Sequence, residues 1–244
     1  MHNAVLGFDS TGKFQQESLA LDYLGYPLVF KRAWTEHPLR DGVKVDSHIS
    51  NQLVFTIQDE IDMKAQEAGL KFLSELSWLY EIAILDVSHG FGDGLRMISQ
   101  FVDYKGMRKK VDLSTYKPLL LDDEQRLAVG LFKEGISNNS PFYRFFSLYN
   151  VIPETKRKKW LEGYFEDRWD DDDFKGRFHI PSKSPEELVQ ALWVNGRCAI
   201  AHNDRKPKMD VHNFPDIGTG LVFYLTIKEA AEQYMINEMG ISRL

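Results

Sequence analysis

Short apolar runs separated by turn residues dominate the first part of the chain. Residues 21–34 (LDYLGYPLVFKRAW) and 50–58 (SNQLVFTIQ) are rich in aromatic and β-branched residues, which favours strands. Between residues 60 and 76 apolar residues recur at helical spacing, and Asp59 or Asp62 is available to begin the helix. This part of the chain therefore predicts strands combined with a helix.

Two further strands are expected before the pattern changes. Residues 78–88 (WLYEIAILDVS) have the composition of a buried strand, which ends at the glycine-rich residues 89–94. Residues 106–114 (GMRKKVDLS) predict another strand. The glycine-rich stretch lacks the spacing of a phosphate-binding loop, so we interpret it as a turn.

From about residue 120 the apolar positions follow helical spacing. Helices are expected over residues 121–137, 140–152, 154–165, 184–204 and 226–239, with an acidic loop over 167–183. Ser184 and Glu187 form a capping box, and Pro185 stands at the first helical position. The pattern predicts an α+β protein, with an N-terminal mixed α/β module over residues 1–115 and a C-terminal helical bundle over 116–244.

Composition limits the classes of function that remain. The net charge of −6 means that a nucleic-acid site must be a local basic patch. Cys198 is the single cysteine, which excludes an intramolecular disulfide and a cysteine-rich zinc site. The N-terminus has no basic leader, and no apolar run approaches the roughly 20 residues that span a bilayer. We expect a cytoplasmic protein with no membrane segment, no metal and no cofactor.

The helix expected over residues 184–204 carries two large side chains, Arg197 and His202, among small apolar residues. At 100° per residue both sides of this helix are apolar, so it is expected to lie centrally in the bundle or against a second subunit. A buried arginine needs an acidic partner, a phosphate or an exit to solvent. From spacing alone, a core histidine and a salt-bridged arginine remain an open interpretation.

Two segments carry a resemblance to a known family. RCAIAH (residues 197–202) fits the R-x4-6-H motif of HEPN domains, and PFYRFFSLYNVI (residues 141–152) resembles the aromatic helix that precedes this motif. Over residues 120–240 the chain resembles bacterial HEPN-like proteins of the methylamine-utilisation accessory type. The resemblance implies a HEPN-like helical bundle that dimerises and cleaves RNA without a metal, in a toxin or defence role.

The resemblance also implies roles for particular residues. His202 would act as general acid or base on a ribose 2′-hydroxyl, and Arg197 would hold the phosphate. We expect four further residues to contact the substrate. These substrate-binding residues are Tyr143, Arg144, Asn203 and Arg205. Cys198 stands where active family members often carry asparagine or aspartate.

Other functions remain open. The chain can be a non-catalytic accessory module that binds a nucleotide or a protein, or a structural protein in which Arg197 and His202 hold helices together. The basic segments 107–110, 156–159 and 204–208 either contact phosphates or are solvated. The expected partners are RNA or a nucleotide, a second copy of the chain and an unidentified protein inhibitor.

Overall fold

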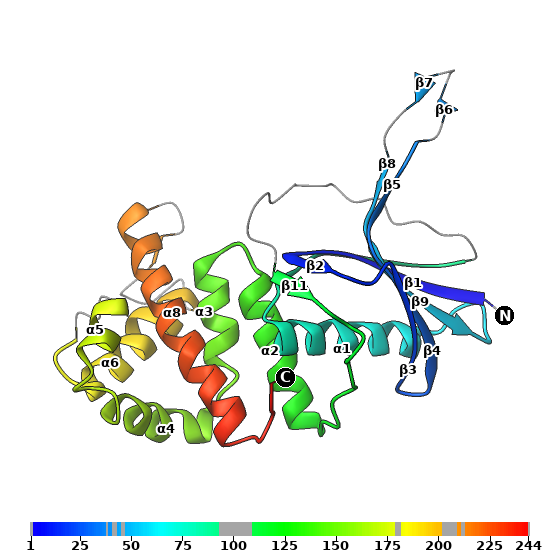
Figure 1. Ribbon diagram of the computed structural model, residues 1–244. Coiled ribbons are helices and arrows are strands. Elements are labelled where there is room, and N and C mark those ends of the chain that lie inside the picture. The colour runs from blue at the N-terminus through cyan, green and yellow to red at the C-terminus, as the bar shows by residue number, and fades with distance from the viewer. Residues whose placement is uncertain are drawn as a thin grey trace. The chain divides into compact units, whose positions relative to one another are not determined.

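The computed structural model describes residues 2–37, 39–40, 43–44, 47–92, 109–178, 182–201, 209–210 and 213–243 (Figure 1). The chain divides into two compact units, which we call the β-rich unit (residues 1–120) and the helical unit (residues 121–243). The mixed α+β class is therefore confirmed, with strands in the first part and helices in the second. The predicted domain boundary between residues 115 and 116 stays a prediction.

The β-rich unit is built on a five-stranded antiparallel sheet with the strand order β10-β1-β9-β4-β3. Its strands are β1 (His2–Ser10), β3 (Ser18–Tyr23), β4 (Tyr26–Lys31), β9 (Asn51–Ile57) and β10 (Ile84–Phe91). Leu24 and Gly25 join β3 to β4, and both have positive φ angles. Positive φ at both central residues is what a two-residue hairpin turn requires, and glycine adopts it without strain.

Helix α1 (Met63–Tyr80) lies against one face of this sheet (Figure 1). Asp62 begins the helix because its side chain accepts hydrogen bonds from the backbone N–H groups of the first turn. The buried face of α1 packs on side chains from alternate positions of the strands. Gly69 allows the close approach, since a Cβ atom there would lie 3.0 Å from side-chain atoms of Leu6 and Phe55.

Short strands complete this unit. They pair as β2 (Gly12–Phe14) with β11 (Lys109–Val111), β5 (Trp34–Glu36) with β8 (Ser47–Ile49), and β6 (Leu39–Arg40) with β7 (Val43–Lys44). The prediction of a buried strand over residues 78–88 is wrong in its first half. Trp78 to Tyr80 complete α1, and β10 is largely exposed because it is the edge strand of the sheet.

A buried carboxyl group joins α1 to the end of the β-rich unit. Glu75 is 1% exposed and accepts hydrogen bonds from the hydroxyls of Tyr23 (2.6 Å) and Tyr116 (2.7 Å) and from the backbone N–H of Leu119 (3.0 Å). Burial, followed by the charge of Glu75, raises the pKa of Tyr116, so its hydroxyl keeps the donated proton. This cluster connects the helix, the sheet and residues 116–119.

The helical unit contains eight helical segments among the described residues. They are α2 (Asp123–Ser137), α3 (Pro141–Tyr149), α4 (Glu154–Glu166), α5 (Asp172–Phe178), α6 (Pro185–Ala191), the π-helix η1 (Leu192–Cys198), α7 (Ala199–Ala201) and α8 (Phe214–Asn237). Helix α3 packs against both α2 and α8 (Figure 1). Asp122 and Gln125 form a reciprocal capping box at the start of α2.

Three predictions for this unit are wrong in detail. The acidic segment 167–183 is not wholly a loop, because Asp172–Phe178 form α5. Helix α8 begins at Phe214, well before the predicted start at Thr226. The helix after Pro185 is not buried on both sides within this chain, since Asn195 is exposed and Trp193 is half-buried.

Candidate functional site

The segment that carries Arg197 changes from an α-helix to a π-helix and back. Ser184 caps α6 by accepting a hydrogen bond from the N–H of Glu187, which is half of the predicted capping box, because the Glu187 carboxylate accepts from the N–H of Lys183. The change to η1 occurs at Leu192. Segments with π-helical hydrogen bonding are rare and occur often at functional sites. At Gly196 the segment packs closely against α3, because a Cβ atom there would lie 2.7 Å from Cζ of Phe145.

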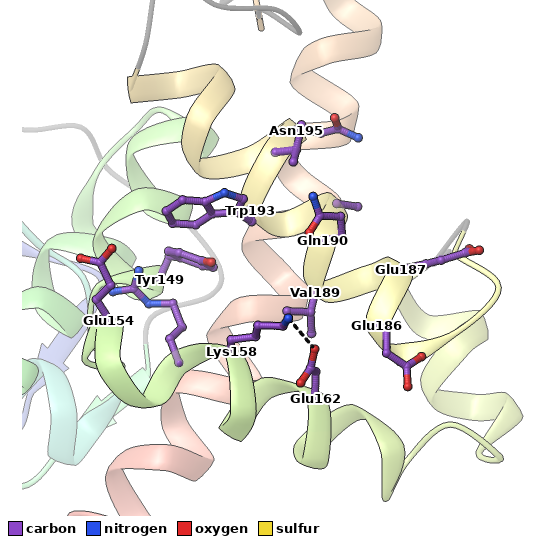
Figure 2. Close-up of a pocket in the computed structure, with 13 residues that line it drawn as sticks. Tyr149, Glu154, Lys158, Glu162, Glu186, Glu187, Val189, Gln190, Trp193 and Asn195 are labelled. Carbon is purple, nitrogen blue, oxygen red and sulfur yellow. Dashed lines mark ion pairs between the residues drawn. The ribbon is translucent and has the colours of Figure 1, made fainter.

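A cavity of about 920 Å³ lies against this segment, between α4 and the α6–η1 helix. Figure 2 shows Tyr149 and Trp193 at one end of the cavity, beside Glu154. Glu186 and Glu187 lie at the other end, and Lys158 and Glu162 lie between the two ends. The volume is in the range of small-molecule and cofactor sites, and the aromatic residues at one end provide flat surfaces.

Arg157, on α4, is a buried cation in the wall of this cavity. The residue is 6% exposed, and its guanidinium donates to the backbone carbonyl of Ile152 (2.9 Å) and to the amide oxygen of Asn150 (3.3 Å). Its Cζ atom lies 4.3 Å from the centroid of the Tyr149 ring. Burial lowers the pKa of Arg157, the adjacent Tyr149 and Glu154 raise it, and the charge of Arg197 lowers it further.

Arg197 lies close to the same phenol. Its Cζ atom is 5.1 Å from the centroid of the Trp193 ring, and the side chain is half-buried. Burial raises the pKa of Tyr149, and the positive charges of Arg157 and Arg197 oppose that increase. We call Tyr149, Arg157, Trp193 and Arg197 the Arg–aromatic cluster. Tyr149, Arg157 and Trp193 line one end of the cavity, whereas Arg197 lies against the ring of Trp193 and is not a lining residue.

Toward the opposite end, the cavity is rich in carboxylates. Lys158 pairs with Glu162 at 3.8 Å, one turn along α4 (Figure 2). Hydrogen bonding to the Ser184 hydroxyl lowers the pKa of Glu186, so this group is ionised at neutral pH. Glu187 accepts a hydrogen bond from the N–H of Lys183 at 2.9 Å. This end therefore presents hydrogen-bond acceptors, whereas the Arg–aromatic cluster presents donors.

The structure describes three of the six site residues predicted from sequence. Arg197 belongs to the Arg–aromatic cluster. Tyr143 is 59% exposed on α3 and is not among the cavity-lining residues. Arg144 donates to the carbonyl of Asn138 and lies 5.2 Å from the ring of Tyr224, also away from the cavity. The other three, His202, Asn203 and Arg205, lie outside the described residues.

Sequence reasoning missed Tyr149, Arg157 and Trp193. A signal for Arg157 was present, because the apolar residues Leu161 and Phe165 follow it at intervals of one helical turn. That spacing places Arg157 on the buried face of α4. From the sequence, the basic run 156–159 was treated as a unit, which either contacts phosphates or is solvated, and Arg157 was not separated from its neighbours.

The helical unit thus contains a cavity with cationic and aromatic side chains at one end. A comparison with protein families finds that residues 128–219 match the model of the family described as methylamine utilization protein MauJ. The match covers less than half of the chain, so it shows a similarity of the helical unit to that family. It includes all four residues of the Arg–aromatic cluster.

This finding corrects the family expected from the sequence. The HEPN assignment is wrong, since the helical unit matches the MauJ model and no HEPN model. A two-residue motif such as Arg197…His202 recurs by chance in many helices, which explains the error. No curated protein and no solved structure matches the chain.

Two searches of the described residues bear on the remaining expectations. No group of three or more histidine, cysteine, aspartate or glutamate side chains in the described ranges is arranged to hold a metal ion. No helix in the same part of the chain is long and apolar enough to cross a membrane.

Proposed function

We propose that the helical unit binds a nucleotide or the end of an RNA chain in the 920 Å³ cavity, with a phosphate at the Arg–aromatic cluster. The observation that carries the proposal is the pair of cations around Tyr149. Arg157 is desolvated, and Arg197 is near enough to lower its pKa. A phosphate in the cavity beside Arg157 would counter the desolvation of this guanidinium group and its repulsion from Arg197.

The rest of the cavity suits the other parts of a nucleotide. Trp193 and Tyr149 offer ring surfaces on which a base can stack, which is favourable for any base. Toward the far end the carboxylates of Glu162 and Glu186 can accept hydrogen bonds from ribose hydroxyls or exocyclic amino groups. A phosphate at the cationic end and a base or sugar toward the acidic end would match this charge distribution.

Replacing Arg197 by glutamine is expected to weaken the binding of adenosine monophosphate at least about tenfold, because a hydrogen-bonded charge contributes roughly 1.5–3 kcal/mol. Trp193→Leu is expected to weaken it about fivefold or more through lost stacking. Isothermal titration calorimetry measures both effects. Lys175→Gln is the matched control, since Lys175 is a cation on α5 that does not line the cavity.

Unchanged affinity in the Arg197 and Trp193 variants would contradict the proposal. Binding of methylammonium, but not of the nucleotide, would also contradict the proposal. A small cation would bind to the carboxylates and to the ring of Trp193, not to the arginines. The same titrations with methylammonium chloride separate these outcomes.

A second candidate function, metal-independent RNA cleavage, is favoured by the place of Arg197. In the sequence His202 directly follows α7 and comes five residues after Arg197, whose guanidinium lies over the ring of the cavity-lining Trp193. In this reaction a ribose 2′-hydroxyl attacks the adjacent phosphorus and loses its proton to a base. The P–O5′ bond breaks, the 5′-oxygen is protonated, and a 2′,3′-cyclic phosphate remains. Dimerisation and a protein inhibitor stay predictions.

Incubation of the protein with RNA in EDTA tests cleavage. We expect the wild type to cut and His202→Ala to bind RNA without cutting, because this change removes the acid or base and leaves Arg157 and Arg197 in place. Arg197→Ala should lose cleavage as well, because the scissile phosphate is no longer held at the Arg–aromatic cluster. Equal cleavage by wild type and His202→Ala, with folding checked by circular dichroism, would rule out this assignment.

A further inference from the structure

Helix α4 borders a second cavity, on the side away from the first. This cavity has a volume of about 550 Å³ and is lined by residues of α4 and α8 together with Asp167 and Arg168. None of its lining residues lines the first cavity. We call it the α4–α8 groove.

The basic run 156–159 is divided between the two cavities. Lys156 and Lys159 line the α4–α8 groove, whereas Arg157 and Lys158 line the first cavity. Residues three apart share one face of a helix, which accounts for the first pair. Burial raises the pKa of Tyr234, and the positive charge of Lys156 opposes this increase. The ammonium group of Lys156 therefore lies near the phenol of Tyr234, which also lines the groove.

A stack of planar side chains continues from these lysines along α4. Trp160 lies parallel to Tyr164, with ring centroids 5.1 Å apart and an interplanar angle of 13°. The Cζ atom of Arg168 is 4.1 Å from the centroid of Tyr164, on the same stack. Trp160 also meets the ring of Tyr234 edge to face at 5.2 Å. Tyr164 and Tyr234 are buried and Trp160 is half-exposed, so Trp160 presents a held aromatic surface to the groove.

The charges of the groove favour an anionic ligand. Three cations line it, Lys156, Lys159 and Arg168, against the two carboxylates of Asp167 and Glu238. The chain as a whole is acidic, with a net charge of −6, so this is a local exception to the overall charge. Cations in line with aromatic surfaces are the combination that binds single-stranded nucleic acid.

We propose that the α4–α8 groove binds a single-stranded polynucleotide, with successive phosphates at Lys156 and Lys159 and a base stacked on Trp160. An acidic peptide could use the lysines but would gain nothing from Trp160, whereas a nucleobase has a flat face for it. This site goes beyond the proposed nucleotide cavity because it uses none of the same residues, and either site can exist without the other.

Fluorescence anisotropy with a labelled uridine oligonucleotide of about ten residues tests the proposal in the full chain. We expect the double variant Lys156→Gln, Lys159→Gln to raise the Kd about tenfold. The slope of log K against log salt should fall by about 1.4, because each phosphate contact to a single strand contributes about 0.7. Trp160→Leu should raise the Kd about fivefold or more through lost stacking.

The matched control is Lys175→Gln, Lys183→Gln, which removes the same charge from the helical unit at two positions outside the groove. An unchanged Kd and salt slope in the Lys156, Lys159 variant would overturn the proposal. Equally tight binding of polyglutamate would also overturn it. If Trp160→Leu unfolds, the lysine variant decides, since both lysines are exposed.

Two further measurements distinguish binding in the α4–α8 groove from binding in the nucleotide cavity. The Lys156, Lys159 variant should bind adenosine monophosphate as the wild type does, and Arg197→Gln should keep most of its affinity for the oligonucleotide. A deoxyuridine oligonucleotide of equal length shows whether the site distinguishes RNA from DNA. Stronger loss of oligonucleotide binding in Arg197→Gln than in the lysine variant would assign the strand to the first cavity and overturn the groove.

Discussion

Replacing Glu75 by alanine is expected to lower the free energy of unfolding of the β-rich unit by about 4 kcal/mol. Hydrogen bonds to a charged group contribute roughly 1.5–3 kcal/mol each, and Glu75 accepts three. The substitution also leaves the hydroxyls of Tyr23 and Tyr116 without this acceptor in a buried site. Hydrogen exchange of the α1 amides, measured by mass spectrometry, reports the opening free energy of this unit.

Two conservative variants control this prediction. Glu75→Gln keeps the size and one acceptor oxygen but loses the charge, so we expect a smaller loss, of about 2 kcal/mol. Tyr116→Phe removes one donor only, and its effect should shrink when Glu75 is already alanine. A loss below about 1 kcal/mol in Glu75→Ala would mean that the cluster contributes little to stability.

Gly196→Ala is expected to destabilise the helical unit by about 1–3 kcal/mol, the usual cost of adding a methyl group to a packed core. The new Cβ atom would lie 2.7 Å from Cζ of Phe145 and 3.3 Å from Cδ2 of Phe223. Both rings must shift, or η1 must move away from α3 and α8. Urea unfolding followed by circular dichroism measures the change.

The same substitution at Gly130 is the matched control. Gly130 lies within α2, and a Cβ atom there meets nothing within 4 Å. Gly130→Ala should therefore stabilise the protein by about 0.5–1 kcal/mol, because alanine loses less conformational entropy in a helix. If Gly196→Ala and Gly130→Ala changed the free energy of unfolding in the same direction, close packing at Gly196 would not account for the effect of Gly196→Ala.

Local signals in the sequence predicted much of the secondary structure. Strands were expected where β3, β4 and β9 lie, and helices where α1 to α4 and α6 lie. The starts of α1 at Asp62 and of α6 at Ser184 followed from capping residues. These features depend on residues a few positions apart, so the sequence contains the information in readable form.

The incorrect predictions concern features that depend on contacts between residues far apart in the sequence. Trp78 to Tyr80 were predicted to begin a strand, but they continue α1, where Trp78 and Leu79 are buried. The motif Arg197…His202 suggested the wrong family, since two residues of a short pattern carry little information beside a match over residues 128–219. The helix over residues 184–204 was expected to be covered on both sides, yet Asn195 is exposed on a π-helix that an ideal 100° rotation does not describe.

The sequence by itself determined that this protein has a strand-rich first part and a helical second part, because apolar periodicity and capping act locally. Only the tertiary structure decided which cations line a cavity. The four basic residues 156–159 look alike in sequence, yet packing of α4 buries Arg157 beside Tyr149 and leaves Lys156 and Lys159 at the α4–α8 groove. The burial of Arg157 and its proximity to Arg197 depend on helices that meet only in the folded chain. Both effects shift the pKa of Arg157 in the wall of the cavity.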